Sequence, residues 1–244
     1  MRATTLSRRV AAEGLGTALL LATIIGSGIM GERLAAGNVA IALLANTLAT
    51  GAVLIALILT FGPISGAHLN PAVTLGDAFQ RGLPWREVPA YVAAQVVGAF
   101  VGVAIAHVMF GEPVFFASHH ARAGIPQLVS ECVATFGLMA VIAGCSRGHP
   151  AAVSFAVGAY ITAAYWFTSS TSFANPAVTL ARSMSDTFAG IRPVDVGGFI
   201  LAELTGAVAA VALFHWLLPR SRVRWRAGCR TAPRARRPAR IARG

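Results

Sequence analysis

Apolar residues are gathered along the chain in six long runs, and short polar stretches separate the runs. Three intervals contain no charged residue at all: 34–61, 88–111 and 148–181. Each is longer than the roughly 20 residues that an α-helix needs to cross a bilayer. The pattern predicts an all-α membrane protein with spans at about 11–31, 38–61, 87–110, 126–146, 150–169 and 195–218.

Two moderately apolar stretches, 62–86 and 170–194, are not part of these spans. Part of each stretch is needed for turns, and the rest is too short to cross the membrane completely. Both contain the string Asn-Pro-Ala-Val-Thr-Leu, which begins at Asn70 and again at Asn175, 105 positions later. Six identical residues in order indicate an internal duplication.

Matched residues in the spans extend the duplication. Glu13-x-x-x-Thr17 corresponds to Glu131-x-x-x-Thr135, and Gln95-x-x-Gly98 corresponds to Glu203-x-x-Gly206. The repeats, about 8–110 and 126–218, therefore hold three spans and one half-length segment each. Because three is odd, the second repeat enters the membrane upside down. Inverted repeats of this kind place the functional site at their interface, near the midplane.

The repeated motif has a direct physical meaning. Asn is a strong helix N-cap, and Pro suits the next position because its missing N–H has no helical partner there. Two short helices should therefore begin at Asn70-Pro71-Ala72 and Asn175-Pro176-Ala177, enter from opposite faces and meet at their N-termini. Unpaired N–H groups and helix dipoles make that point positive. The physics predicts a pore that repels cations and passes neutral, hydrogen-bonding solutes.

Composition and charge support a membrane protein and argue against a nucleic-acid partner. The 244-residue chain is 56% hydrophobic and 12% charged, with a net charge of +11. Ten of the 20 basic residues, all arginine, fall within 219–244, beyond the last apolar run. This tail is predicted to be disordered and to face anionic lipid on the cytoplasmic side. The arginines divide sixteen to four between the two faces, which places both termini inside.

No cofactor, metal site or enzymatic activity is expected. The spacing of Cys132, Cys145 and Cys229 does not fit a metal site. His119 and His120 are adjacent, with no third ligand nearby. The spans show no readable nucleophile–base spacing.

An ion-coupled secondary transporter is the alternative from another class, because such proteins also use inverted repeats. It would need buried carboxylates for a coupling ion, and Glu13, Glu131 and Glu203 are the candidates. Their matched places in the two repeats suit the anchoring of loops better.

The chain resembles the major intrinsic protein family, the aquaporins and aquaglyceroporins, over roughly residues 8–218. The resemblance is carried by Ala12-Glu13-Gly14-Leu15-Gly16-Thr17, by Ser65-Gly66-Ala67-His68-Leu69-Asn70-Pro71-Ala72-Val73-Thr74 and by Asn175-Pro176-Ala177. It implies a homotetramer with one pore in each protomer. It also implies that Glu13 and Glu131 accept hydrogen bonds from the re-entrant segments.

One position departs from the family pattern. The residue after the second Asn-Pro-Ala is nearly always Arg in the family, where it forms the narrow outer filter, but here it is Val178. Counting from the two motifs places Thr50, Ala163 and Ser172 at the other filter positions. All four are small, so we expect a wide filter that passes water, glycerol-like polyols and uncharged metalloid acids such as arsenite. A water-selective channel is the alternative.

The residues around Val178 resemble a bacterial branch of the family that is linked to arsenic handling, which implies a bacterial inner-membrane protein. Arg182 lies one helical turn beyond Val178, and we expect it to line the outer vestibule and to let methylated arsenicals pass. The alternative is that Arg182 pairs with Asp186. His68 is expected near the cytoplasmic mouth, in a packing role or as a pH gate.

Overall fold

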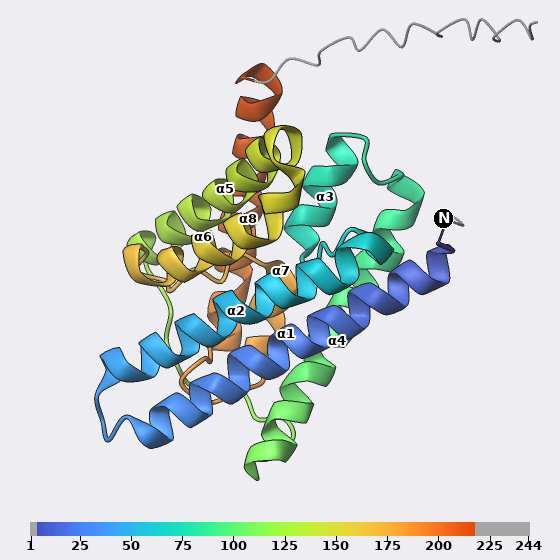
Figure 1. Ribbon diagram of the computed structural model, residues 1–244. Helices are drawn as coiled ribbons and strands as arrows, with labels where there is room; N and C mark the ends of the chain where they lie inside the picture. The colour runs from blue at the N-terminus through green and yellow to red at the C-terminus, as the bar shows by residue number, and fades with distance from the viewer. Residues whose placement is uncertain (1–3, 218–244) are drawn as a thin grey trace, which may run out of the picture.

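The computed structural model describes residues 4–217 and confirms the predicted architecture (Figure 1). Six long helices form the bundle: α1 Leu6–Leu34, α2 Val39–Ser65, α4 Val88–Phe110, α5 Ile125–Gly148, α6 Val153–Phe167 and α8 Pro193–Leu217. Short 3-10 turns, Trp85–Glu87 and Pro150–Ala152, lead into α4 and α6. Two half-length helices complete the fold: α3 Pro71–Phe79 and α7 Pro176–Arg182. The arginine-rich tail, 219–244, lies outside the described residues.

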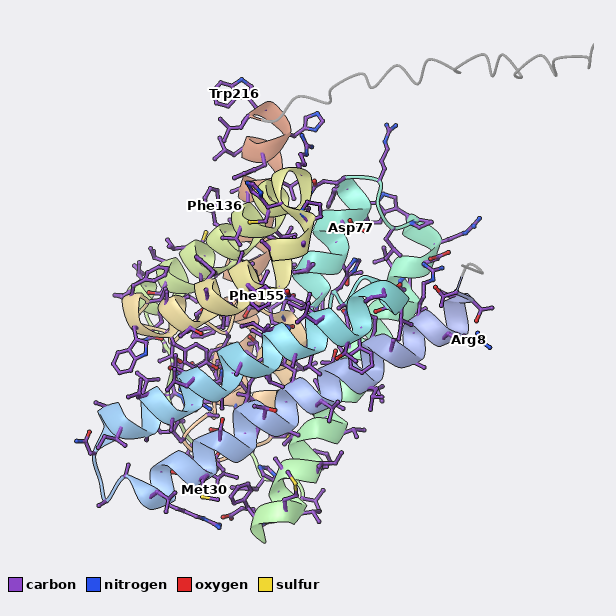
Figure 2. All side chains as sticks on the ribbon, in the orientation of Figure 1. Arg8, Met30, Asp77, Phe136, Phe155 and Trp216 are labelled. Atoms are coloured by element: carbon purple, nitrogen blue, oxygen red, sulfur yellow. The ribbon has the colours of Figure 1, made fainter. Side chains whose placement is uncertain are left out.

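The outer surface of the bundle is apolar. All six long helices have the length and hydropathy needed to cross a membrane, α4 and α6 together with the 3-10 turns that precede them. Large apolar side chains project outward from several helices, among them Met30, Phe155 and Trp216 (Figure 2). Such a surface is stable against lipid chains, and it identifies an integral membrane protein.

Within each repeat, the first and third long helices pack very closely. In the first repeat α1 packs against α4, and in the second α5 packs against α8. A Cβ atom added at Gly98 would overlap the carbonyl oxygen of Gly14, and one added at Gly206 would overlap that of Cys132. Glycine at 98 and 206 therefore permits close contact of the helix backbones.

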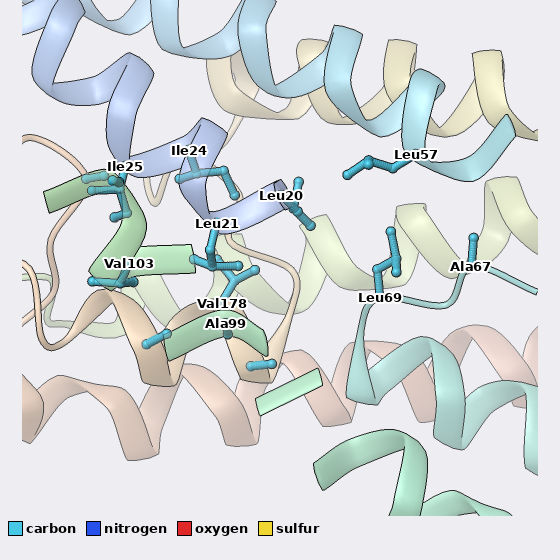
Figure 3. Packing of buried hydrophobic residues seen from close by; sticks show 14 of the residues in the cluster. Leu20, Leu21, Ile24, Ile25, Leu57, Ala67, Leu69, Ala99, Val103 and Val178 are labelled. Atoms are coloured by element: carbon cyan, nitrogen blue, oxygen red, sulfur yellow. The ribbon is translucent and has the colours of Figure 1, made fainter. Parts of the chain in front are cut away.

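The two repeats also interlock. Helix α2 packs against α6, while α7 contacts α4 of the first repeat and α3 contacts α8 of the second. Buried apolar residues of α1 and α4 surround Val178 of α7, including Leu21 and Ala99 (Figure 3). Each half-helix is thus held by both repeats, which fixes the two N-termini relative to each other.

Candidate functional site

Asparagine begins both half-helices, as the sequence predicts. Asn70 is the N-cap of α3, and its Oδ1 accepts the N–H of Ala72 at 2.8 Å. Asn175 is the N-cap of α7, and its Oδ1 accepts the N–H of Ala177 at 3.1 Å. Each Oδ1 is occupied by its own helix, so both amide groups are turned with Nδ2 away from that helix.

The two asparagines reach across the interface between the repeats. Asn70 Nδ2 donates to the carbonyl of Ala174 at 2.7 Å, and Asn175 Nδ2 donates to the carbonyl of Leu69 at 2.8 Å. An amide NH₂ group has two hydrogens. Each asparagine therefore keeps one N–H that a solute oxygen can accept, and the two half-helix N-termini lie together.

Unusual backbone conformations allow each asparagine to form a hydrogen bond with the opposite repeat. Ala67 and Leu69 have φ values of 49° and 51°, and Ser172 and Ala174, 105 positions later, both have φ of 50°. Residues other than glycine adopt the left-handed region only rarely. Both re-entrant segments thus repeat one strained path, and it presents the carbonyls that the opposite asparagines use.

Buried carboxylates anchor both segments. Glu13 on α1 accepts the N–H groups of His68 and Leu69 at 3.0 and 2.7 Å. Glu131 on α5 accepts the N–H groups of the two residues before Asn175, each at 2.8 Å. These bonds compensate the burial of backbone donors that no helix satisfies.

A cavity of about 490 Å³ passes the two asparagines. At the side predicted to be cytoplasmic its lining includes Arg9, His68, Asp77 and Arg147, a set we call the inner mouth. Beyond the asparagines it is lined by Thr50, Tyr165, Ser172, Val178 and Arg182, a set we call the outer chamber. Apolar residues form much of the remaining wall: Leu20, Ile24, Leu54, Ile58, Val157 and Ile161. The cavity therefore has a polar stripe and an apolar wall.

The expectation for Ala163 is wrong. The residues of α6 that line the cavity are Val153, Val157, Ile161 and Tyr165, spaced four apart on one face of the helix. Ala163 lies midway between the last two, on the opposite face, and is exposed. A position found by counting back along the sequence from Asn175 does not take into account which face of α6 that residue lies on. Tyr165 takes the place assigned to Ala163, and its hydroxyl donates to the hydroxyl of Thr50 at 3.2 Å.

Arg182 is buried beside the outer chamber. Only 2% of the residue is exposed, and its guanidinium carbon lies 3.3 Å from the centroid of the Phe173 ring. Its Nε donates to the carbonyl of Ala189, while one terminal nitrogen has no protein partner within the described chain. Among the ion pairs of residues 4–217, Arg182 does not pair with Asp186, so the alternative is not found. The guanidinium therefore keeps donors available near the cavity.

Asp186 instead holds the outer loop. It accepts the backbone N–H of His119 at 2.8 Å, and its other oxygen lies 2.8 Å from the His119 ring. These contacts, the backbone bond first, hold the pKa of Asp186 below its ordinary value. The pair ties the loop before α5 to the loop after α7.

A second buried arginine was not anticipated from the sequence. Arg122 donates to the carbonyls of Gly190 and Ser170 at 2.8 and 3.1 Å, and it lies 4.9 Å from the ring of Phe173. Burial lowers its pKa to about 10, so it stays charged at neutral pH. Two cations thus contact one aromatic ring near the outer chamber.

His68 lies at the inner mouth, as expected. Its Nδ1 is 3.2 Å from the hydroxyl of Thr74, and its Nε2 is 3.6 Å from a carboxylate oxygen of Asp77. The ring therefore packs against α3 while it lines the cavity. Within residues 4–217, no three His, Cys, Asp or Glu side chains lie close enough together to hold a metal ion.

Comparison with known proteins agrees with this geometry. Residues 1–149 match the family model described as major intrinsic protein. The chain is 56% identical over 217 residues to the aquaglyceroporin AqpS of Rhizobium meliloti, covering 89% of this chain and 93% of that one. It is 35% identical over 170 residues to the aquaporin NIP1-1 of Oryza sativa, covering 68% and 59%.

The fold has a counterpart among solved structures. The aquaglyceroporin from Plasmodium falciparum superposes with a TM-score of 0.68, covering 86% of this chain and 96% of that one. The two sequences are 20% identical, so this likeness concerns the fold alone.

Proposed function

The chain belongs to the major intrinsic protein family, and from this premise we propose that its pore passes a broad range of uncharged solutes, including polyols and metalloid acids such as arsenite as well as water. It is an integral membrane protein and an aquaglyceroporin-type channel, not an enzyme. The observation that carries the proposal is Val178 at the outer chamber, where the family nearly always has arginine.

The outer chamber supports a wide filter. Thr50, Ser172 and Val178 are small residues that line it. One of the bulky side chains there, Tyr165, is tied to Thr50 through its hydroxyl, which keeps the ring against the wall. Without an arginine at 178, no long side chain extends from the first turn of α7 into this space.

The chemistry of the cavity suits amphipathic neutral solutes. Asn70 and Asn175 supply free N–H donors on one side, while Leu20, Ile24 and Val157 supply an apolar wall. Glycerol has hydroxyls along one edge and C–H groups along the other, and it can meet both at once. A trihydroxy metalloid acid presents similar hydroxyls without charge.

Cations should be excluded and some anions tolerated. The N-termini of α3 and α7 make the midplane positive. Arg182 adds a buried cation with unused donors just beyond. We therefore propose that singly charged methylated arsenicals pass as well.

The test compares osmotic swelling of proteoliposomes in water, glycerol and arsenite gradients, with and without Val178→Arg. The variant should keep water flux within about twofold and cut glycerol and arsenite flux at least tenfold, equal to about 1.4 kcal/mol of added barrier. Equal effects on water and on the larger solutes would refute the wide filter and favour the water-selective alternative.

A matched control separates size from charge. Val178→Arg places two guanidinium groups one helical turn apart, and their repulsion costs about 3 kcal/mol at about 6 Å and an effective dielectric constant of about 20. Combining Val178→Arg with Arg182→Val restores a single guanidinium on α7. This double variant should also block glycerol, because the obstruction at 178 remains. Arg182→Ala alone should reduce methylarsenate flux, and unchanged flux would remove Arg182 from the proposal.

Three further features rest on the resemblance and on the arginine distribution. We propose a homotetramer, an inner-membrane location in a bacterium and cytoplasmic termini. Cross-linking in native membranes tests the first, and protease accessibility of the ends in sealed vesicles tests the last. Dependence of solute flux on an ion gradient would instead favour the coupled transporter.

A further inference from the structure

Two carboxyl groups lie beneath the re-entrant segment of the second repeat. Glu131 accepts the N–H groups of Phe173 and Ala174, and Glu203 Oε1 accepts the N–H of Asn175 at 3.2 Å. Three successive backbone donors thus go to two carboxyl groups, both fully buried. Burying two adjacent negative charges would be very costly.

In the first repeat, one carboxylate and one amide occupy the corresponding positions. Gln95 Nε2 lies 2.8 Å from Glu13 Oε2 and 2.8 Å from the hydroxyl of Thr74. A carboxylate oxygen only accepts hydrogen bonds, so the atom that faces Glu13 is the NH₂ of the amide. Glu13 therefore receives a donor from the neighbouring helix α4.

Glu203 occupies the place in the second repeat that Gln95 occupies in the first. Three residues after Gln95, Gly98 packs on the carbonyl of Gly14, the residue that follows Glu13. Three residues after Glu203, Gly206 packs on the carbonyl of Cys132, which follows Glu131. The two helix crossings have the same register, so the side chains at 95 and 203 face their anchoring glutamates in the same way.

The oxygens of Glu203 have different surroundings. Oε1 accepts both the Thr179 hydroxyl, at 2.5 Å, and the N–H of Asn175. Oε2 is buried, and no donor reaches it in the part of the chain described. The matched register of the two helix crossings places the Glu203 side chain next to Glu131, as Gln95 lies next to Glu13. An ionised Oε2 would be an unsatisfied acceptor beside a second carboxylate, whereas an O–H there would donate to Glu131 as the Gln95 amide donates to Glu13.

We propose that Glu203 is a positioning residue that carries a proton on Oε2, donates it in a hydrogen bond to Glu131 and holds Asn175 through Oε1. Each re-entrant segment is then anchored by a single negative charge. A second charge at this place would offset the positive dipole at the start of α7, which amounts to about half an elementary charge. The proton therefore maintains both the position of Asn175 and the barrier to cations.

The other charged and titratable groups near the Glu131–Glu203 pair are Arg182 of α7, Arg122 of the loop before α5, and Tyr160 and Tyr165 of α6. The two arginines are the obvious alternative partners for an ionised Glu203. Arg182 Nε donates instead to the carbonyl of Ala189, and Arg122 donates to the carbonyls of Gly190 and Ser170. No salt bridge joins either arginine to Glu203 among residues 4–217. The geometry thus favours a protonated acid over a counterion.

The experiment uses the full chain in proteoliposomes and compares the wild type, Glu203→Gln and Gln95→Glu. Glutamine has the same shape and donates without titrating, so Glu203→Gln should keep glycerol flux within about twofold of the wild type at neutral pH. A carboxyl that is protonated when folded and ionised when unfolded gives a stability that falls as the pH rises. The apparent melting temperature of the wild type should therefore fall from neutral to alkaline pH more steeply than that of Glu203→Gln. Gln95→Glu should show a steeper fall than the wild type.

Infrared difference spectra give an independent readout. The wild type should show the C=O stretch of a buried protonated carboxylic acid, and Glu203→Gln should lack it. The proposal is overturned if the wild type has no such band, or if all three proteins share one pH slope. It is equally overturned if Glu203→Gln melts lower and conducts less at every pH, as the loss of a counterion to Arg182 would require. The inference rests on the channel activity of the family and not on the wide filter, because the melting and infrared readouts do not depend on which solutes pass.

Discussion

Replacing Glu13 by Gln should be far more damaging than its conservative appearance suggests. The carboxylate of Glu13 accepts four hydrogen bonds, two at each oxygen. The Ser65 hydroxyl and the His68 N–H go to Oε1, at 2.6 and 3.0 Å, while the Leu69 N–H and the Gln95 amide go to Oε2, at 2.7 and 2.8 Å. In glutamine one of these oxygens becomes an NH₂ group, which then faces two other donors.

The destabilisation caused by Glu13→Gln follows from the number of hydrogen bonds that are lost. Whichever way the new amide turns, two hydrogen bonds to a charged acceptor are lost, and each contributes about 1.5–3 kcal/mol. The expected destabilisation is therefore roughly 3–6 kcal/mol before relaxation. At about 2–4 °C per kcal/mol for a chain of this size, the apparent melting temperature should fall by roughly 6–24 °C. Glycerol flux should fall too, because the backbone that ends at Asn70 loses its anchor.

The assay is thermal unfolding of the purified protein in detergent, followed by swelling of proteoliposomes. Glu32→Gln is the matched control, since Glu32 is exposed on the same helix. If Glu13→Gln melted within a few degrees of Glu32→Gln, the anchoring role of Glu13 would be refuted. The contrast with Glu203→Gln is informative, because the same chemical change is expected to be harmless there.

Three further outcomes are expected. Gly98→Ala should lower stability by about 1–3 kcal/mol in thermal unfolding, because its Cβ meets the α1 backbone, which no side-chain rotation relieves. Tyr165→Trp should reduce glycerol flux in swelling assays while Ala163→Trp leaves it unchanged, and the reverse result would restore the sequence-based filter. Because the pKa of Asp186 is lowered, its contribution to stability is present above the ordinary pKa and lost as the pH falls through the folded value. The protection factor of the His119 amide in hydrogen exchange should therefore fall in acid, and Asp186→Asn should abolish that dependence.

The sequence predicted what local chemistry and duplication determine. Asn70 and Asn175 are N-caps followed by proline, and this local signal survives in any context. The meeting of the two half-helices followed from the odd number of spans in each repeat. The N-caps and the meeting of the half-helices could both be predicted from short sequence motifs and from the number of apolar segments.

The outer chamber could not be predicted in the same way. Helix α6 is apolar on nearly every face, so its sequence carries no signal of which residues face the cavity. Only the packed bundle shows that the face with Val157, Ile161 and Tyr165 lines the cavity, and this face does not include Ala163. Arg122 was missed because its carbonyl partners lie far along the chain and are recognised only after folding.

The reciprocal bonds of Asn70 and Asn175 have a consequence for how such a chain can exist. Each half of the protein contains a side-chain donor whose acceptor is the backbone of the other half. A polypeptide containing one half alone would leave that amide and its matching carbonyl without partners in the lipid interior. It would therefore require an oppositely inserted second copy, so the smallest unit able to enclose this conduit is an antiparallel pair, here joined into one chain.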